Sequence, residues 1–288
     1  MPRLEHRRIN LAGVGLHYIQ AGEGPVVLLV HGLATSSATW SHNIEPLADA
    51  GYSVLALDLP GFGESDRPRS LNYGPEAGAG LIHEFLDALD VDRVSLVGNS
   101  AGGLISGVFA LDHPNRVQRL VLIASGGLGR DVSWGLRILS VPVLGELVYR
   151  PRFLSLLKIS NRVFYRPQEI PEGSLSDLHR SRSSPESRRA TIQAIRACVT
   201  LFGQKSRCRI LDRLEGLEAP IMTVWGTEDR YIPVSHANMI GMALPRSLVR
   251  TIPECGHWPQ MEKSAEFNAL LIEFLEGGLD DVARLPGQ

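Results

Sequence analysis

A serine framed by glycines is the residue of this chain best placed to do chemistry. Residues 98–102 read Gly-Asn-Ser-Ala-Gly, the pattern G-x-S-x-G with Ser100 at its centre. An apolar run, Val94–Val97, precedes the pattern, and apolar residues at helical spacing follow it as far as Pro114. A serine on such a strand-to-helix turn presents its hydroxyl as a nucleophile, beside free N–H groups that can stabilise an oxyanion. The alternative is a glycine-rich turn with an incidental serine, so the rest of the chain must decide.

A serine nucleophile needs a base, and the base needs an acid that orients it. Asp229 and His257 each lie in a loop directly after a predicted strand. Because the carboxyl ends of parallel strands meet at one edge of a sheet, we expect both side chains to lie near Ser100. The order Ser, Asp, His along the chain is that of proteins with a nucleophile elbow. Glu228, one residue before Asp229, is the alternative acid.

Strands alternate with helices along most of the chain, which indicates a mostly parallel sheet covered by helices on both faces. Apolar runs predict strands at residues 9–11, 16–19, 26–30, 52–57, 94–97, 119–124, 220–225 and 247–252. Helical spacing predicts helices at residues 75–89, directly after Ser100, and at 267–274. The fold class is therefore α/β.

The alternation stops between about residues 128 and 213, where the pattern is helical and no convincing strand is found. We interpret this segment as a helical cap inserted into a core formed by residues 1–127 and 214–288. The segment holds 16 Lys and Arg against 7 Asp and Glu, whereas the rest of the chain is net acidic. Its apolar residues, Trp134 and Leu136 among them, are expected to roof the pocket over Ser100. Arg180 or Arg182 is expected to contact a substrate carboxylate, although a solvated arginine face is the alternative.

Composition excludes several other classes of protein. The chain has 288 residues and a formal charge of −2, so nothing favours nucleic-acid binding. No apolar run is long enough for a membrane span, and the first residues lack an apolar signal segment. Three scattered cysteines, Cys198, Cys208 and Cys255, fit a reducing cytoplasm. No metal-binding or phosphate-loop motif occurs, so we expect a cytoplasmic protein without metal or cofactor, and a homodimer is left open.

The chain resembles the capped serine hydrolases of the α/β-hydrolase superfamily in five motifs that stand in the family's order. Besides the G-x-S-x-G pattern, these are His31-Gly32, Asp58-Leu59-Pro60-Gly61-Phe62-Gly63-Glu64-Ser65, Gly226-Thr227-Glu228-Asp229 and Gly256-His257. The resemblance implies the α/β-hydrolase fold, with Ser100 as nucleophile, His257 as base and Asp229 as acid. It also implies an oxyanion hole formed by the backbone N–H groups of Leu33 and Ala101. The residues expected to bind substrate are His31, Gly32, Asn99, Trp134, Leu136, Trp258, Arg180 and Arg182.

Three functions are compatible with this resemblance. A serine nucleophile favours acyl transfer to water, and a carboxylesterase for small to medium acyl esters is our first interpretation. The second is a C–C bond hydrolase of 2-hydroxy-6-oxo-dienoate ring-cleavage products, because the elbow Gly98–Gly103 and the segment Cys255–Trp258 resemble that subgroup. The chain departs from the subgroup at residues 33–37, where Gly-Pro-Gly is typical, and at His42, where Asn is expected. The third is a ligand-binding receptor with an intact triad and little turnover.

Overall fold

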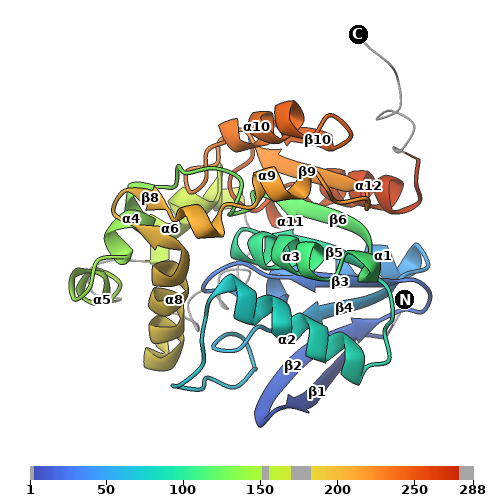
Figure 1. The fold of residues 1–288 in the computed structure, drawn as a ribbon, viewed down its shortest axis with the longest axis horizontal. Helices are drawn as coiled ribbons and strands as arrows, with labels where there is room; N and C mark the ends of the chain where they lie inside the picture. Colours follow the sequence, from blue (N-terminus) through green and yellow to red (C-terminus); the bar gives the residue numbers. More distant parts are fainter. Residues whose placement is uncertain (1–2, 151–155, 170–182, 279–288) are drawn as a thin grey trace.

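An eight-stranded sheet forms the centre of the molecule (Figure 1). The structure is a computed structural model, which describes residues 3–150, 156–169 and 183–278. The strands lie in the order β1-β2-β4-β3-β5-β6-β9-β10, and all neighbours are parallel except the β1–β2 and β2–β4 pairs. Their bounds are β1 Glu5–Leu11, β2 Val14–Ala21, β3 Val26–Val30, β4 Ser53–Leu57, β5 Val94–Asn99, β6 Val117–Ile123, β9 Ile221–Gly226 and β10 Leu248–Ile252. The predicted α/β fold with a mostly parallel sheet is confirmed.

The central strands are mostly apolar because helices cover both faces of the sheet. Successive side chains of a strand point to opposite faces, so Leu28 and Val30 join one core while Val27 and Leu29 join the other. The first core contains residues of α2 (Pro75–Ala88), α3 (Ala101–Asp112) and α10 (Ser235–Ala243). The second contains residues of α1 (Ile44–Asp49) and α12 (Ser264–Leu275).

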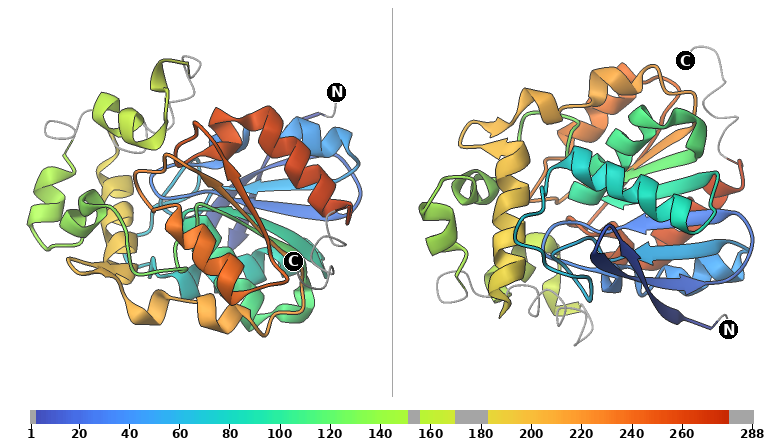
Figure 2. Two further views of the ribbon diagram at one scale, coloured as in Figure 1. Left: turned by 90° about the horizontal axis from the view of Figure 1, so that it is seen from above. Right: turned by 60° about the horizontal axis from the view of Figure 1, so that its bottom comes forward.

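Helices are the main regular elements of the described part of residues 128–213, which we call the cap segment. It lies beside the end of the sheet, with α4 and α5 farthest from α12 (Figures 1 and 2). Its elements are α4 Trp134–Leu139, α5 Leu144–Val148, α6 Leu156–Val163, η3 Pro167–Glu169, α8 Pro185–Cys198, β7 Val199–Thr200, β8 Gly203–Gln204, η4 Ser206–Cys208 and α9 Leu211–Leu214. The remaining short elements are η1 Ser37–Trp40, η2 Pro114–Arg116 and α11 Pro259–Glu262.

The prediction that the cap segment contains no strand is wrong at one place. β7 and β8 pair antiparallel over two residues each, with Val199 opposite Gln204 and Thr200 opposite Gly203. Gly203 has φ +108°, a conformation that strongly favours glycine. A Cβ at this position would also lie 2.5 Å from the backbone oxygen of Arg130. Two residues per strand are too few for the alternation of polar and apolar residues by which strands are predicted.

Candidate active site

The turn after β5 holds Ser100 in a strained backbone conformation, with φ 56° and ψ −114°. The Ser100 N–H donates to the oxygen of Ile123 at 2.9 Å, which ties the turn to the neighbouring strand β6. The glycines on either side are required by space: a Cβ on Gly98 would lie 2.5 Å from the oxygen of Gly102, and one on Gly102 would collide with the oxygen of Val30. The chain can therefore reverse sharply here and present the serine side chain at the sheet edge.

His257 and Asp229 meet as the sequence predicts. The Nδ1 atom of His257 lies 2.7 Å from Oδ2 of Asp229, and the aspartate side chain is fully buried. The other carboxylate oxygen, Oδ1, accepts the N–H groups of Tyr231 at 2.7 Å and Ile232 at 3.0 Å. This acceptor set fixes the carboxylate, and because an ionised carboxylate only accepts hydrogen bonds, we assign the proton of this contact to Nδ1 of His257.

Glu228, the alternative acid, lies at the surface beside Thr227. Its backbone N–H donates to the oxygen of Cys255, which ties the acid loop to the base loop. Because its side chain is exposed while that of Asp229 is buried against His257, the geometry favours Asp229 as the acid.

The loop after β3 brings backbone close to the serine. A Cβ on Gly32 would lie 3.2 Å from Cβ of Ser100, so only glycine allows this approach without displacement. His31 is fully buried; its Nε2 accepts the N–H of Leu59 at 3.0 Å and its Nδ1 donates to the oxygen of Gly32 at 2.7 Å. His31 therefore fixes the shape of this loop.

Two apolar chambers share a wall at the serine, where Leu33, Ser100, Leu136 and Ile195 line both. Ala101 and Gly32 line the first chamber, and His257 lines the second. The first chamber is also lined by Leu59, Phe62, Leu71, Tyr73, Leu81 and Ile105. The second is also lined by Trp134, Leu139, Tyr149, Ile159, Val163 and Trp258.

Two of the residues expected to bind substrate, His31 and Asn99, are buried beside the chambers. Among the described residues that line the two chambers, neither appears. The side chain of Asn99 is 1% exposed, and its Nδ2 donates to the oxygens of Ile123 and His257, both at 3.2 Å. These two bonds fix the amide of Asn99 between β6 and the loop of the base.

Glu262 joins the cap segment to the loop of His257, a contact that no motif in the sequence indicates. Its Oε1 accepts the N–H groups of Tyr165 at 2.7 Å and Arg166 at 3.0 Å, both in the cap segment. Its Oε2 accepts the N–H of Gly256 at 2.6 Å, next to the base. The backbone N–H of His257 itself donates to a cap oxygen, that of Val163, at 2.6 Å. The position of the base therefore depends on how the cap docks.

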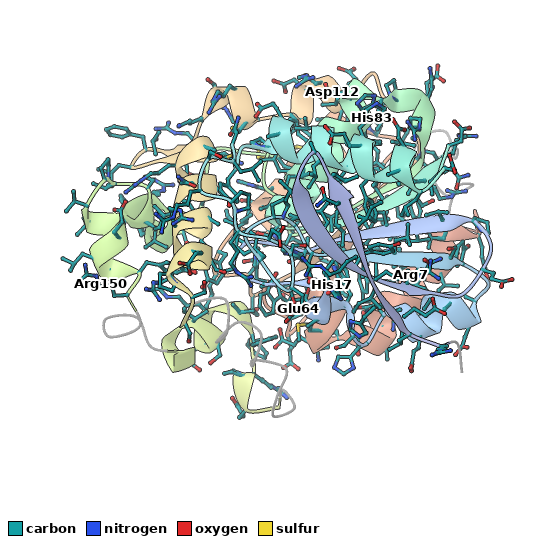
Figure 3. The ribbon with its side chains drawn as sticks, turned by 90° about the horizontal axis from the view of Figure 1, so that it is seen from below. Arg7, His17, Glu64, His83, Asp112 and Arg150 are labelled. Carbon is teal, nitrogen blue, oxygen red and sulfur yellow. The ribbon has the colours of Figure 1, made fainter. Side chains whose placement is uncertain are left out.

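A second histidine–aspartate pair lies in the family-like loop after β4. Asp58 is 1% exposed and its carboxylate contacts Nδ1 of His17 at 2.7 Å and the N–H groups of Ser37 at 2.6 Å and Glu64 at 2.9 Å. Figure 3 labels His17 and Glu64, which both contact this carboxylate where the β1–β2 hairpin meets the loop after β4. Burial alone would raise the pKa of Asp58, but these partners and the charge of His31 hold that pKa below its usual value.

Three further expectations concern the two cap arginines, a metal site and a membrane span. Arg180 and Arg182 lie outside the described residues. Within residues 3–150, 156–169 and 183–278, no group of three His, Cys, Asp or Glu side chains is arranged to hold a metal ion. In the same part of the chain, no helix has both the length and the apolar character needed to cross a membrane.

The chain is similar over nearly its whole length to proteins of one family. A family model described as the alpha/beta hydrolase fold matches residues 25–264. A 2-hydroxy-6-oxo-6-phenylhexa-2,4-dienoate hydrolase of Comamonas testosteroni is 31% identical over 271 residues, which cover 92% of this chain and 93% of that protein.

Solved structures give the same result. A membrane phospholipase A described as a bacterial virulence factor superposes with a TM-score of 0.77 at 30% identity, covering 95% of this chain and 86% of that one. A meta-cleavage product hydrolase from Pseudomonas fluorescens superposes with a TM-score of 0.77 at 26% identity, covering 94% and 98%. The fold, the arrangement around Ser100 and these matches together show that the chain belongs to the α/β-hydrolase family.

Proposed function

We propose that this protein is a serine hydrolase that cleaves carboxylic esters with apolar groups through an acyl-enzyme on Ser100. The observation that carries the proposal is the position of Ser100 on the wall shared by two apolar chambers, one of which also contains His257. An ester has two arms joined at one carbonyl carbon, so one arm fits each chamber while the carbonyl lies at the serine.

The proposed reaction uses each member of the triad in turn. Oγ of Ser100 attacks the carbonyl carbon while Nε2 of His257 takes its proton, and the alkoxide then leaves with that proton as an alcohol. Water repeats the sequence on the acyl-enzyme and releases the acid. Asp229 keeps the imidazole in the tautomer that can accept at Nε2 and stabilises the imidazolium, which its 2.7 Å contact with Nδ1 supports.

The negative charge on the carbonyl oxygen needs donors that are already in place. We assign this role to the backbone N–H groups of Leu33 and Ala101, because both residues line the first chamber with Ser100. Ala101 is the first residue of α3, so its N–H is not used within the helix. Leu33 follows Gly32, on which a Cβ would lie 3.2 Å from Cβ of Ser100.

A C–C bond hydrolase of 2-hydroxy-6-oxo-dienoates is the second candidate. It is supported by relatives named as hydrolases of 2-hydroxy-6-oxo-dienoates at 30–31% identity. It is also supported by Arg162, a residue that lines the second chamber and whose guanidinium is suited to bind a carboxylate. Less favourable are the segment 33–37, which lacks Gly-Pro-Gly, and the apolar character of both chambers. These features favour the ester hydrolase.

Two substrates measured side by side test the proposal. We expect p-nitrophenyl esters of four to eight carbons to be hydrolysed with kcat/KM well above that for 2-hydroxy-6-oxo-6-phenylhexa-2,4-dienoate, and neither to be turned over by Ser100→Ala. Faster cleavage of the dienoate would assign the C–C reaction instead. Thermal stabilisation by these ligands with no turnover of either would indicate a receptor-like binding protein.

A further inference from the structure

The outer surface of the cap segment exposes a group of large apolar side chains, which we call the apolar cap face. They come from α4, from α5 and the residue before it, and from the turn between β7 and β8. Their exposed fractions are 67% for Trp134, 79% for Val143, 43% for Leu144, 44% for Leu147, 44% for Leu201 and 72% for Phe202. Leu201 shares a surface hollow with Val141 and Pro142, which brings the turn beside the start of α5. Exposed apolar patches of this kind mark interaction sites.

The apolar cap face reaches the mouth of the catalytic cavity. Trp134 is two-thirds exposed and yet lines the second chamber, which also contains Ser100 and His257. Leu136, one residue beyond Gly135 on the same helix, lines both chambers. A ligand that leaves a surface covering this face therefore enters the cavity without crossing bulk water.

The surroundings of the face are net positive. Asp131, before α4, is paired with Arg137 at 3.0 Å, and Glu146, on α5, is paired with Arg196 at 2.5 Å. Arg130 and Arg150 are two further exposed arginines in addition to these ion pairs. Figure 3 shows Arg150 at the outer end of the cap. Arg130 donates to the backbone oxygen of Phe202, so positive charge borders the apolar residues directly.

Exposed Trp, Leu and Phe bordered by arginine is the composition of helices that lie in the interface of a membrane with anionic lipids. A second copy of the chain on a two-fold axis would bring the same positive charges together, which disfavours that occupant. We propose that the apolar cap face docks on an anionic phospholipid surface and opens the second chamber to esters in that layer. The delivery of esters rests on the proposed function, whereas the docking itself does not.

Trp134 provides a direct probe of docking. The chain has four tryptophans, and the other three, Trp40, Trp225 and Trp258, are at most 4% exposed. We expect Ser100→Ala protein, which leaves lipid intact, to bind vesicles of phosphatidylglycerol and phosphatidylcholine, with its fluorescence quenched by lipid brominated in the acyl chains. Quenching is expected to be weak on pure phosphatidylcholine, to fall with added salt and to disappear in Ser100→Ala/Trp134→Phe.

A matched pair of variants locates the docking surface. Val143→Ser/Leu147→Ser/Phe202→Ser removes three apolar side chains of the face, none of which lines either chamber. Met242→Ser is the control, because Met242 is 78% exposed on α10 in the core. We expect the triple variant to lose about tenfold or more of its vesicle affinity, with kcat/KM for a soluble short ester unchanged, and the control to lose none.

Three outcomes would overturn the proposal: no quenching on phosphatidylglycerol vesicles at low salt, equal binding by the triple variant, or a concentration-dependent dimer that the triple variant dissociates. The last would assign the face to a second copy of the chain. Vesicle binding without ester turnover would sink the proposed function and leave the docking surface intact, so the two failures can be told apart.

Discussion

Two histidine–aspartate pairs in this molecule have the same geometry and different surroundings. In both, Nδ1 of the histidine lies 2.7 Å from Oδ2 of the aspartate and both side chains are buried, His257 with Asp229 and His17 with Asp58. The first pair lies at the edge of a chamber that contains Ser100. The second lies at the junction between the β1–β2 hairpin and the loop after β4.

The difference lies in the second ring nitrogen of each histidine. Nε2 of His17 lies 2.9 Å from Nδ1 of His6, so both nitrogens of that ring have partners within the protein. His257 lines a cavity, where its Nε2 can meet a serine and a substrate. A histidine–aspartate pair is therefore a bracing device in itself, and it becomes catalytic only where a nucleophile and space for a substrate are added.

Removal of the nucleophile should have the largest effect on the catalytic region. We expect Ser100→Ala to lower kcat for a p-nitrophenyl ester by roughly 10⁴-fold or more, with the Tm little changed. A fluorophosphonate probe should label wild type and not the variant. Labelling of another residue, or hydrolysis that survives the change, would contradict the assignment.

The same substitution in each aspartate tests directly whether the two pairs differ in function. Asp229→Asn should lower kcat by about 10⁴-fold because it favours the wrong tautomer of His257, with little loss of stability. Asp58→Asn should keep kcat within about tenfold but destabilise the fold by about 2–4 kcal/mol, because buried donors lose their charged acceptor. Kinetics and urea unfolding of both variants check this. A similar loss of kcat in the two would show that the pairs are not functionally distinct.

The strands and the triad could be predicted from the sequence because their signals are local. A strand buried on both faces must be a continuous apolar run, as in Val26–Val30, and active residues must follow strand ends. The position of Asp58 at a strand end predicts a hydrogen bond that fixes its loop, but not its partner, because His17 lies 41 residues away on an antiparallel strand.

The residues that position the base could not be predicted, because their partners are distant in sequence. Asn99 donates to the oxygen of a residue 158 positions away, and Glu262 accepts from Tyr165, 97 positions away. An asparagine beside a nucleophile suggests a substrate contact, and only the fold shows that its side chain turns behind the elbow. Backbone groups carry no sequence signal at all, so the clamp on Gly256 appears only in three dimensions.

The oxyanion loop of the catalytic region should be next in effect. Leu33→Pro removes one backbone N–H, and the loss of one such donor costs about 3 kcal/mol of transition-state stabilisation, roughly 150-fold in kcat. Leu33→Ala is the control, because it keeps the N–H and changes only the apolar wall. Full kcat in a normally folded Leu33→Pro protein would place the oxyanion hole elsewhere.

The cap contact should have a smaller effect than the triad. Glu262→Gln replaces one acceptor oxygen by a donor facing N–H groups, so the cap should hold the loop of His257 less well. We expect kcat/KM to fall by about tenfold. Glu266→Gln is the control, because that glutamate is exposed on α12. Equal activity of the two variants would show that the clamp does not position the base.

The smallest expected effect is a loss of folding stability at acid pH through the pair of His17 and Asp58. The pKa of Asp58 in the folded chain lies below its usual value; burial opposes this, and His17 and the backbone donors outweigh burial. The unfolded chain therefore takes up a proton at this residue first as the pH falls below about 4, and unfolding becomes easier. Above that range the charged carboxylate contributes its full stabilisation. The difference in free energy of unfolding between wild type and Asp58→Asn should accordingly narrow as the pH falls from 4 to 3. Urea titrations at several pH values measure this difference, and a gap that stays constant or widens would mean that Asp58 does not carry the acid sensitivity.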